Sequence, residues 1–244
     1  MAVTLTPIEW LQSISVLIFI IISLILGIKI ILKYFKHERK ELLFAGLTII
    51  LMLAPYYNDP ISFFLIITTG KPVDVIIIYL GIGIVALANI TWGFVYTELL
   101  KKEKQRLILG FLTAQTIIFE FILIYAIFFN PSLILIPFGD RFYREAPLLI
   151  GFYIFWLILY LFMGFSIAIV AYKSDNREVH LKGIFLLLAM SSYVVGTLLD
   201  FAIEISAITI IVGRIIMITS YIEFYLGFIL PNWVKDFFIK SEAE

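Results

Sequence analysis

The chain has 244 residues, 62% of them hydrophobic, and its mean hydropathy is +1.07. Several apolar runs exceed the roughly 18 residues that mark a membrane-spanning helix, which excludes an ordinary soluble domain. The 18 Lys and Arg residues balance the 18 Asp and Glu residues, and the lack of cysteine excludes disulfides and thiolate metal sites. We therefore expect a multi-pass protein of the cell membrane.

Seven apolar spans follow one another along the chain, and each is expected to be a helix. Residues 16–26 (VLIFIIISLIL) are apolar on all sides apart from one serine, whereas a β-barrel strand alternates apolar and polar residues over about 10 positions. The predicted fold is an all-α seven-helix transmembrane bundle, formed by one domain over residues 1–238 with a polar tail at 239–244. The spans are 8–33, 42–68, 74–99, 107–129, 147–172, 183–205 and 208–230.

Basic residues are concentrated on one side of this bundle. Lys71, Arg141 and Arg144 fall on the poorly charged side. Because cytoplasmic loops carry an excess of Lys and Arg, the N-terminus is predicted to lie outside and the C-terminus inside. On the opposite side are 13 of the 18 basic residues, in segments 33–41, 101–106, 173–182 and after residue 231.

The second span contains the sequence Pro55-Tyr56-Tyr57-Asn58-Asp59-Pro60 in its outer half. Each proline removes an amide donor and kinks a helix. One interpretation is a broken helix that lines a wet cavity, since exposed backbone polar groups are tolerated at membrane depth only there or inside protein. The other is that the helix stops near Tyr57 and that residues 61–69 form a short interfacial return.

The connection 130–147 is the only long loop that the sequence predicts. Its residues 133–136 are apolar, while Asp140, Arg141, Arg144 and Glu145 are charged. We expect the loop to lie in the membrane interface or to fold over the mouth of the bundle as a lid.

Asp200 and Arg214 lie at matching depths in the sixth and seventh spans. The connection near Ser206–Ala207 is short, so the two helices are antiparallel neighbours, and both residues lie about 10 Å from the turn. A charge inside an apolar span costs roughly 2.5–3.5 kcal/mol on insertion scales and usually finds a partner inside the bundle. We predict an Asp200–Arg214 ion pair, with Glu204 as a second acceptor.

Glu120 lies near the middle of the fourth span, where an ionisable group is a functional candidate. The alternative is a structural carboxyl group that is hydrogen-bonded to a neighbour. Aromatic residues also recur at helical spacing in the fifth to seventh spans; such stripes are more often packing than binding sites. The predicted ligand-binding residues are Tyr56, Asn58, Asp59, Glu120, Tyr153, Trp156, Tyr193, Asp200, Glu204 and Arg214.

Several kinds of site are excluded by the sequence. His37 and His180 both fall in predicted cytoplasmic loops, so no histidine-based zinc or haem site is expected in the membrane. HExxH, GxSxG and Walker motifs are absent, and no lysine occurs between Ala207 and Leu230 to form a retinal Schiff base. We expect no cofactor and no metal. An enzyme that acts on lipid is the least favoured alternative, because no nucleophile and base are recognisable at suitable spacing.

The layout of seven spans with an outside N-terminus and short basic cytoplasmic loops resembles seven-helix receptors. In particular it resembles the membrane sensor modules of archaeal and bacterial histidine kinases. The last predicted helix ends in the sequence Gly227-Phe228-Ile229-Leu230-Pro231-Asn232-Trp233. This sequence looks like the junction between the last helix of such modules and their cytoplasmic domain. Unlike those modules, this chain is expected to have no output domain after Trp233.

The resemblance implies a receptor-like or sensor-like protein that binds an unknown small molecule in an outer-half pocket. Its expected partners are the lipid bilayer and a separate cytoplasmic signalling protein, without nucleic acid. One alternative is a proton- or ion-coupled transporter or channel that uses Glu120 and the broken second span; transporters commonly contain an internal repeat, and none is visible here. Another is a membrane subunit of a larger complex.

Overall fold

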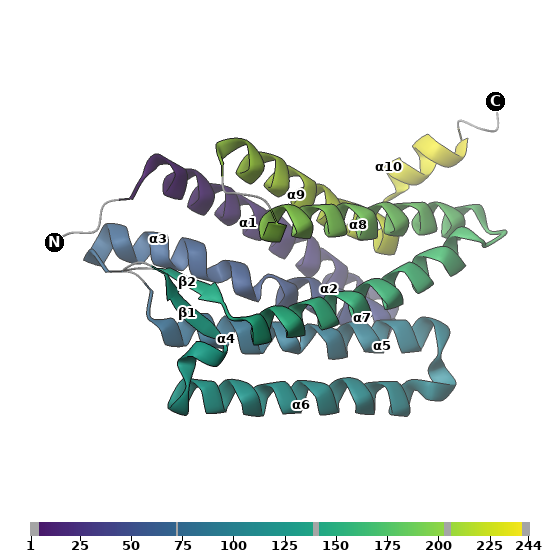
Figure 1. Cartoon of the computed structure of the whole chain (residues 1–244). Coiled ribbons are helices and arrows are strands. Elements are labelled where there is room, and N and C mark those ends of the chain that lie inside the picture. Colours follow the sequence, from purple (N-terminus) through teal and green to yellow (C-terminus); the bar gives the residue numbers. More distant parts are fainter. Residues whose placement is uncertain (1–4, 72, 139–141, 203–205, 241–244) are drawn as a thin grey trace.

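The structure is a computed structural model that describes residues 5–71, 73–138, 142–202 and 206–240. Its helices run back and forth along one direction (Figure 1). In chain order the elements are α1 (Pro7–His37), α2 (Lys40–Met52), η1 (Ala54–Tyr57), α3 (Asn58–Thr69), α4 (Val75–Ala86), α5 (Ala88–Leu100), η2 (Lys102–Lys104), α6 (Gln105–Phe129), η3 (Pro131–Leu133), β1 (Leu135–Phe138), β2 (Phe142–Glu145), α7 (Pro147–Tyr172), α8 (Arg177–Ala202), α9 (Ala207–Ile229), α10 (Asn232–Lys235) and the π-helical η4 (Asp236–Lys240).

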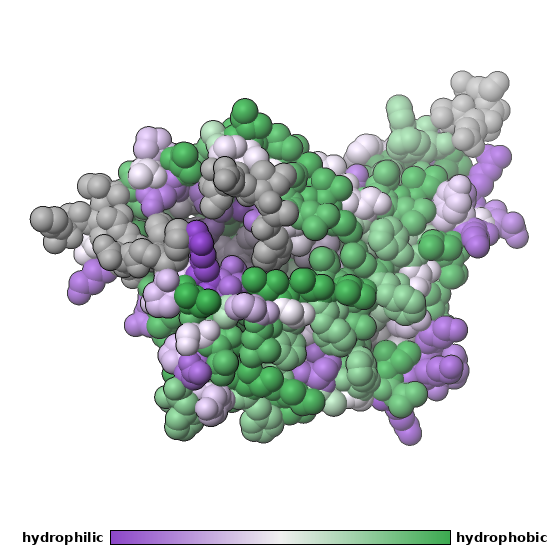
Figure 2. Space-filling model, viewed as in Figure 1, coloured by the Kyte–Doolittle hydropathy of each residue, from purple (hydrophilic) through white to green (hydrophobic). Residues whose placement is uncertain are grey.

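Within the described ranges, six helices are long and apolar enough to cross a membrane. A seventh crossing is present if α2 and the segment Ala54–Thr69, which are bent by 41° relative to each other, count as one span. In Figure 2 hydrophobic atoms cover much of the middle of the visible face, and hydrophilic atoms gather mostly toward its two ends. The all-α prediction is thus confirmed, with one short hairpin added.

Local capping signals explain where the helices begin. Thr6 caps α1 through a reciprocal pair of hydrogen bonds with Glu9, and Pro7 occupies the first turn. Ser206 and Thr209 form the same kind of box at the start of α9, where the sequence predicts the turn. These contacts satisfy amide donors that have no partner inside the helix.

The segment predicted as the second span is bent by 41° at its Pro-Tyr-Tyr-Asn-Asp-Pro sequence. Pro55 lacks an amide hydrogen, and the chain passes through the 3-10 turn η1 before α3 begins. The Asn58 side chain donates to the Pro55 carbonyl at 3.2 Å, and the Tyr57 hydroxyl donates to the Ile50 carbonyl at 3.3 Å. After this 41° bend, α3 continues from Asn58 to Thr69.

Six spans close into a ring. The second of them is the α2–η1–α3 span and the third is the α4–α5 helix, which has a short irregularity at Leu87. Around the ring, α1 contacts α2, α2 contacts α5, α5 contacts α7, and α7, α8, α9 and α1 follow in turn. Helix α6 lies outside this ring on one flank of the bundle, against α4 and α5 (Figure 1).

The predicted long loop contains an antiparallel hairpin, β1–β2, with Leu135 opposite Glu145 and Ile136 opposite Arg144. Ile134 is fully buried before the hairpin, and the Tyr79 hydroxyl donates to the Pro131 carbonyl at 3.1 Å. The described part of the loop is therefore anchored on the bundle. The sequence analysis missed these strands because the hairpin is short. We call the end of the bundle that carries it the hairpin end.

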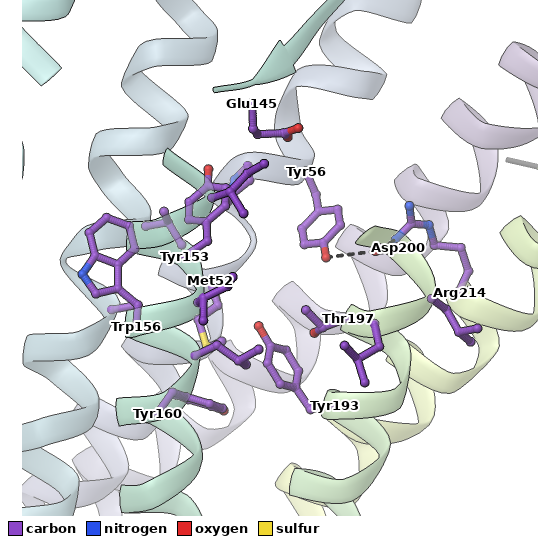
Figure 3. Close-up of a pocket in the computed structure, with 18 of the residues that line it drawn as sticks. Met52, Tyr56, Glu145, Tyr153, Trp156, Tyr160, Tyr193, Thr197, Asp200 and Arg214 are labelled. Atoms are coloured by element: carbon purple, nitrogen blue, oxygen red, sulfur yellow. Dashed lines mark hydrogen bonds and ion pairs between the residues drawn. The ribbon is translucent and has the colours of Figure 1, made fainter. Parts of the chain in front are cut away.

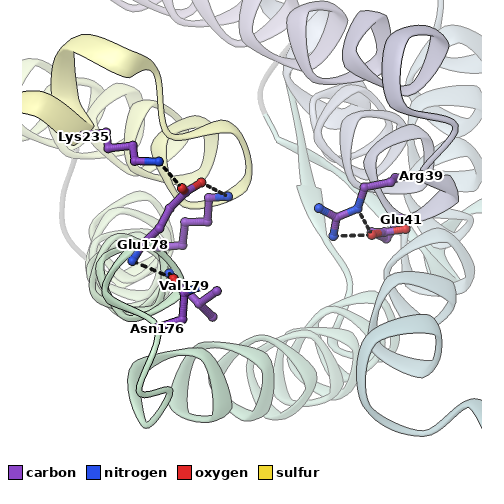
Figure 4. Close-up of polar contacts among 7 residues, drawn as sticks. Arg39, Glu41, Asn176, Glu178, Val179 and Lys235 are labelled. Atoms are coloured by element: carbon purple, nitrogen blue, oxygen red, sulfur yellow. Dashed lines mark hydrogen bonds and ion pairs between the residues drawn. The ribbon is translucent and has the colours of Figure 1, made fainter.

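The opposite, basic end is held by ion pairs (Figure 4). Glu178 accepts from Lys182 of its own helix at 3.1 Å and from Lys235 of α10 at 2.5 Å. The Asn176 side chain accepts from the Glu178 and Val179 amides and so caps α8. This cap begins α8 at Arg177, earlier than the predicted residue 183.

Candidate ligand-binding pocket

A pocket of about 600 Å³ lies inside the ring, between the hairpin end and the middle of the bundle. Its volume is in the range of small-molecule sites, which is roughly 300–1,000 Å³. Both helix irregularities border it: Pro55 belongs to the bend of the second span, and Ala88 follows the break at Leu87. The residues that line it include Gln12, Tyr56, Asp59, Ala88, Asn89, Glu145, Tyr153, Trp156, Tyr160, Tyr193, Thr197, Asp200 and Arg214.

The Asp200–Arg214 ion pair forms one wall of the pocket. The Arg214 Nη1 atom lies 2.8 Å from Asp200 Oδ2, and the two side chains are 7% and 21% exposed respectively. Tyr56 from the bent second span donates its hydroxyl to the same Asp200 oxygen at 3.1 Å (Figure 3). The Arg214 guanidinium also lies 5.3 Å from the centre of the Tyr56 ring, within cation–π distance. Three spans therefore meet at this pair.

Two further carboxylates line the pocket away from the ion pair. Asp59 accepts a hydrogen bond from the Gln12 amide at 3.0 Å, which joins α3 to α1. Glu145, the last residue of the hairpin, lies at the hairpin side of the pocket (Figure 3). Neither carboxylate is within ion-pair distance of a basic side chain among the described residues, although Asp59 interacts electrostatically with Arg214 and with Glu145.

Aromatic side chains form most of the remaining wall. Tyr153, Trp156 and Tyr160 project from successive turns of α7, and Tyr193 projects from α8 (Figure 3). The rings of Tyr160 and Tyr193 have centres 5.3 Å apart. Trp156 is fixed by a hydrogen bond of 2.7 Å from its ring nitrogen to the Gln115 side chain of α6. This packing gives the pocket an ordered aromatic surface.

Buried polar groups lie in the pocket wall. Asn89 lines the pocket and is only 5% exposed. The Arg214 Nε atom is buried and has no partner within the described residues. A buried polar group without a hydrogen bond costs roughly 1–3 kcal/mol, so this atom favours a ligand or water that supplies the missing partner.

The predicted site residues divide into three groups. The predicted Asp200–Arg214 pair is confirmed, and Glu204 lies outside the described residues. Asn58 bonds the backbone at the bend, and Glu120 on α6 lies beside Gly83 of α4; neither lines the pocket. The other seven predicted ligand-binding residues all line the pocket: Tyr56, Asp59, Tyr153, Trp156, Tyr193, Asp200 and Arg214.

Gln12, Asn89 and Glu145 line the pocket and were missed by the sequence analysis. Gln12 and Asn89 are polar residues inside apolar spans, and this property was a usable signal. Glu145 gave a weaker signal, because its position depends on the hairpin that carries it over the bundle.

Comparison of the chain with models of known protein families, with curated proteins and with solved structures finds no match. Within the described residues, no group of three or more His, Cys, Asp or Glu side chains is arranged to hold a metal ion.

Proposed function

We propose that this chain is a receptor-like membrane protein with seven spans, its N-terminus outside and its C-terminus in the cytoplasm. It binds a small molecule in the pocket and signals through a separate cytoplasmic partner. With this orientation the hairpin end faces outward, so the ligand comes from outside the cell.

The observation that carries this proposal is the pocket itself, a ligand-sized space with ordered aromatic walls and buried polar groups. Such a concave, mostly apolar site with a few convergent polar groups is the usual form of a small-molecule site. A transporter that used Glu120 and the bent span as one path would need both in one cavity. The pocket lining includes Asp59 of the bent span and lacks Glu120.

The Asp200–Arg214 pair supplies a route from the pocket to the basic end. A ligand that displaces the Tyr56 hydroxyl from Asp200 changes a contact shared by the bent span, α8 and α9. Helix α9 runs from this pair to Ile229, and α10 follows at the basic end. A change in the tilt of α9 would therefore be presented to a cytoplasmic partner through α10.

The orientation predicts opposite labelling at the two ends of the bundle. Because the chain has no cysteine, Lys71→Cys and Lys102→Cys each introduce a single thiol by the same substitution. An impermeant maleimide should label Lys71→Cys in intact cells and should label Lys102→Cys only after the membrane is opened. The reverse pattern would place the pocket on the cytoplasmic side.

Filling the pocket is expected to abolish ligand binding. Ala88 is 4% exposed and lines the pocket, so Ala88→Phe places a ring where a ligand would lie. Fragments that bind the purified wild-type protein, measured by ligand-observed NMR, should bind this variant at least about tenfold more weakly. Ala114→Phe on the exposed face of α6 is the matched control and should bind them normally.

Circular dichroism and thermal unfolding show whether the Ala88→Phe protein is folded. Spin labels at Leu107 and Phe237, which are 74% and 69% exposed, report the distance between α6 and the C-terminal helix. A receptor requires this distance to change when a fragment binds. Equal binding by both phenylalanine variants, or an unchanged distance with ligand bound, contradicts the proposed function.

A further inference from the structure

The pocket wall has an excess of negative charge. Among the described residues of the lining, Asp59, Glu145 and Asp200 contribute three carboxylates, and Arg214 is the one cation. Arg214 is already paired with Asp200, so the charge of that pair is balanced. Asp59 and Glu145 are left facing the same space without ion-pair partners among the described residues.

Aromatic rings surround this negative space. Tyr153 and Glu145 both line the pocket, and Tyr160 and Tyr193 lie on the opposite side of the pocket from Glu145 (Figure 3). The face of an aromatic ring attracts a cation within about 6 Å, by about 0.5–1 kcal/mol at exposed sites and by more where water is excluded. The carboxylates and the tyrosine rings around this cavity therefore both favour a positively charged ligand.

The hydrogen-bonding groups fit the same ligand. Asn89 is buried in the wall, and its side-chain carbonyl can accept from an N–H donor. An anionic ligand would instead be repelled by the carboxylates of Asp59 and Glu145. The one basic side chain among the described lining residues that could bind it, Arg214, already forms an ion pair with Asp200. A bare metal ion does not need a mostly apolar cavity of about 600 Å³.

We infer that the ligand is a small organic cation, a protonated amine carried on an apolar or aromatic body. Its ammonium group lies beside Asp59, toward Glu145, and its body lies among the tyrosines and Trp156 of α7 and α8. This inference rests on the proposed function and names the class of ligand for that site.

Three probes of similar size test the charge directly: 2-phenylethylammonium, 2-phenylethanol and 3-phenylpropanoate. Binding is measured by titration calorimetry with the full chain in nanodiscs of zwitterionic lipid, with empty nanodiscs as the blank. The amine should bind at least about tenfold more tightly than the alcohol, and the carboxylate most weakly.

The variant Asp59→Asn keeps the oxygen that accepts from Gln12 and removes the charge. It should weaken amine binding about tenfold and leave alcohol binding unchanged. Asp74→Asn is the matched control, because Asp74 caps α4 near the same end of the bundle and does not line the pocket. Glu145→Gln provides a second test at the mouth if Asp59→Asn does not fold.

Each other outcome overturns the inference. Equal weakening by Asp59→Asn and Asp74→Asn means that general surface charge attracts the amine. If 3-phenylpropanoate binds most tightly, Arg214 is the group that recognises the ligand. If 2-phenylethanol binds more tightly than the amine, or if the amine does not bind, the ligand is not a cation. The proposed function is judged separately, because fragments that bind wild type and are lost in Ala88→Phe support the pocket whatever their charge.

Discussion

Replacing Asp200 with alanine is expected to lower the free energy of unfolding by about 3 kcal/mol, the lower end of the range for a buried pair that loses one partner. The Arg214 side chain is only 7% exposed, and a guanidinium cannot give up its proton to become neutral. It would remain charged and largely desolvated. Asp59 also interacts with Arg214, and this compensation sets the expectation at the lower end.

Arg214→Met is expected to be milder than Asp200→Ala. The Asp200 side chain is 21% exposed and still accepts from the Tyr56 hydroxyl, so the carboxylate left behind is partly stabilised. Methionine also keeps most of the apolar stem of the arginine. The double variant should be more stable than Asp200→Ala alone, because it leaves no stranded guanidinium.

Thermal and denaturant unfolding in detergent measure this double-mutant cycle. Lys102→Met is the control, since its ion pair with Glu98 is exposed and contributes at most about 1 kcal/mol. Additive effects of the two single substitutions would show that Asp200 and Arg214 do not interact. A more stable Asp200→Ala than Arg214→Met would contradict the asymmetry that follows from their burial.

Gly183→Ala is expected to destabilise the protein by roughly 3 kcal/mol, at the upper end of the usual overpacking cost. A Cβ atom at Gly183 of α8 would lie 2.2 Å from the backbone nitrogen and 2.6 Å from the Cα of Tyr172 in α7. These are backbone atoms and cannot turn aside as a side chain does. The two helices would have to separate where the short α7–α8 connection holds them together.

Gly110→Ala makes the same chemical change on α6, where an added Cβ meets nothing within 4 Å. Alanine is favoured over glycine in a helix by up to about 1 kcal/mol, so this variant should be neutral or slightly more stable. Unfolding midpoints of the two proteins in one detergent give the comparison. Similar midpoints would show that α7 and α8 do not approach each other so closely at Gly183.

The long helices could be predicted from the sequence because their causes are local. Uninterrupted apolar runs and capping pairs such as Thr6 with Glu9 mark the helices and the start of α1. The Asp200–Arg214 pair was predictable for a similar reason: the short connection at Ser206 makes α8 and α9 antiparallel neighbours with matched depths. A buried charge then has few partners within reach.

Tertiary structure alone decided which residues share the pocket. A helix that is apolar on all sides, such as α7, gives little sign of which face turns inward, since both core and lipid are apolar. The packing order places α6 outside the ring, which separates Glu120 from the pocket, and the hairpin carries Glu145 over it. Gln12, Asn89 and Asp59 come together from three spans far apart in the chain, because long-range packing decides which helices are neighbours.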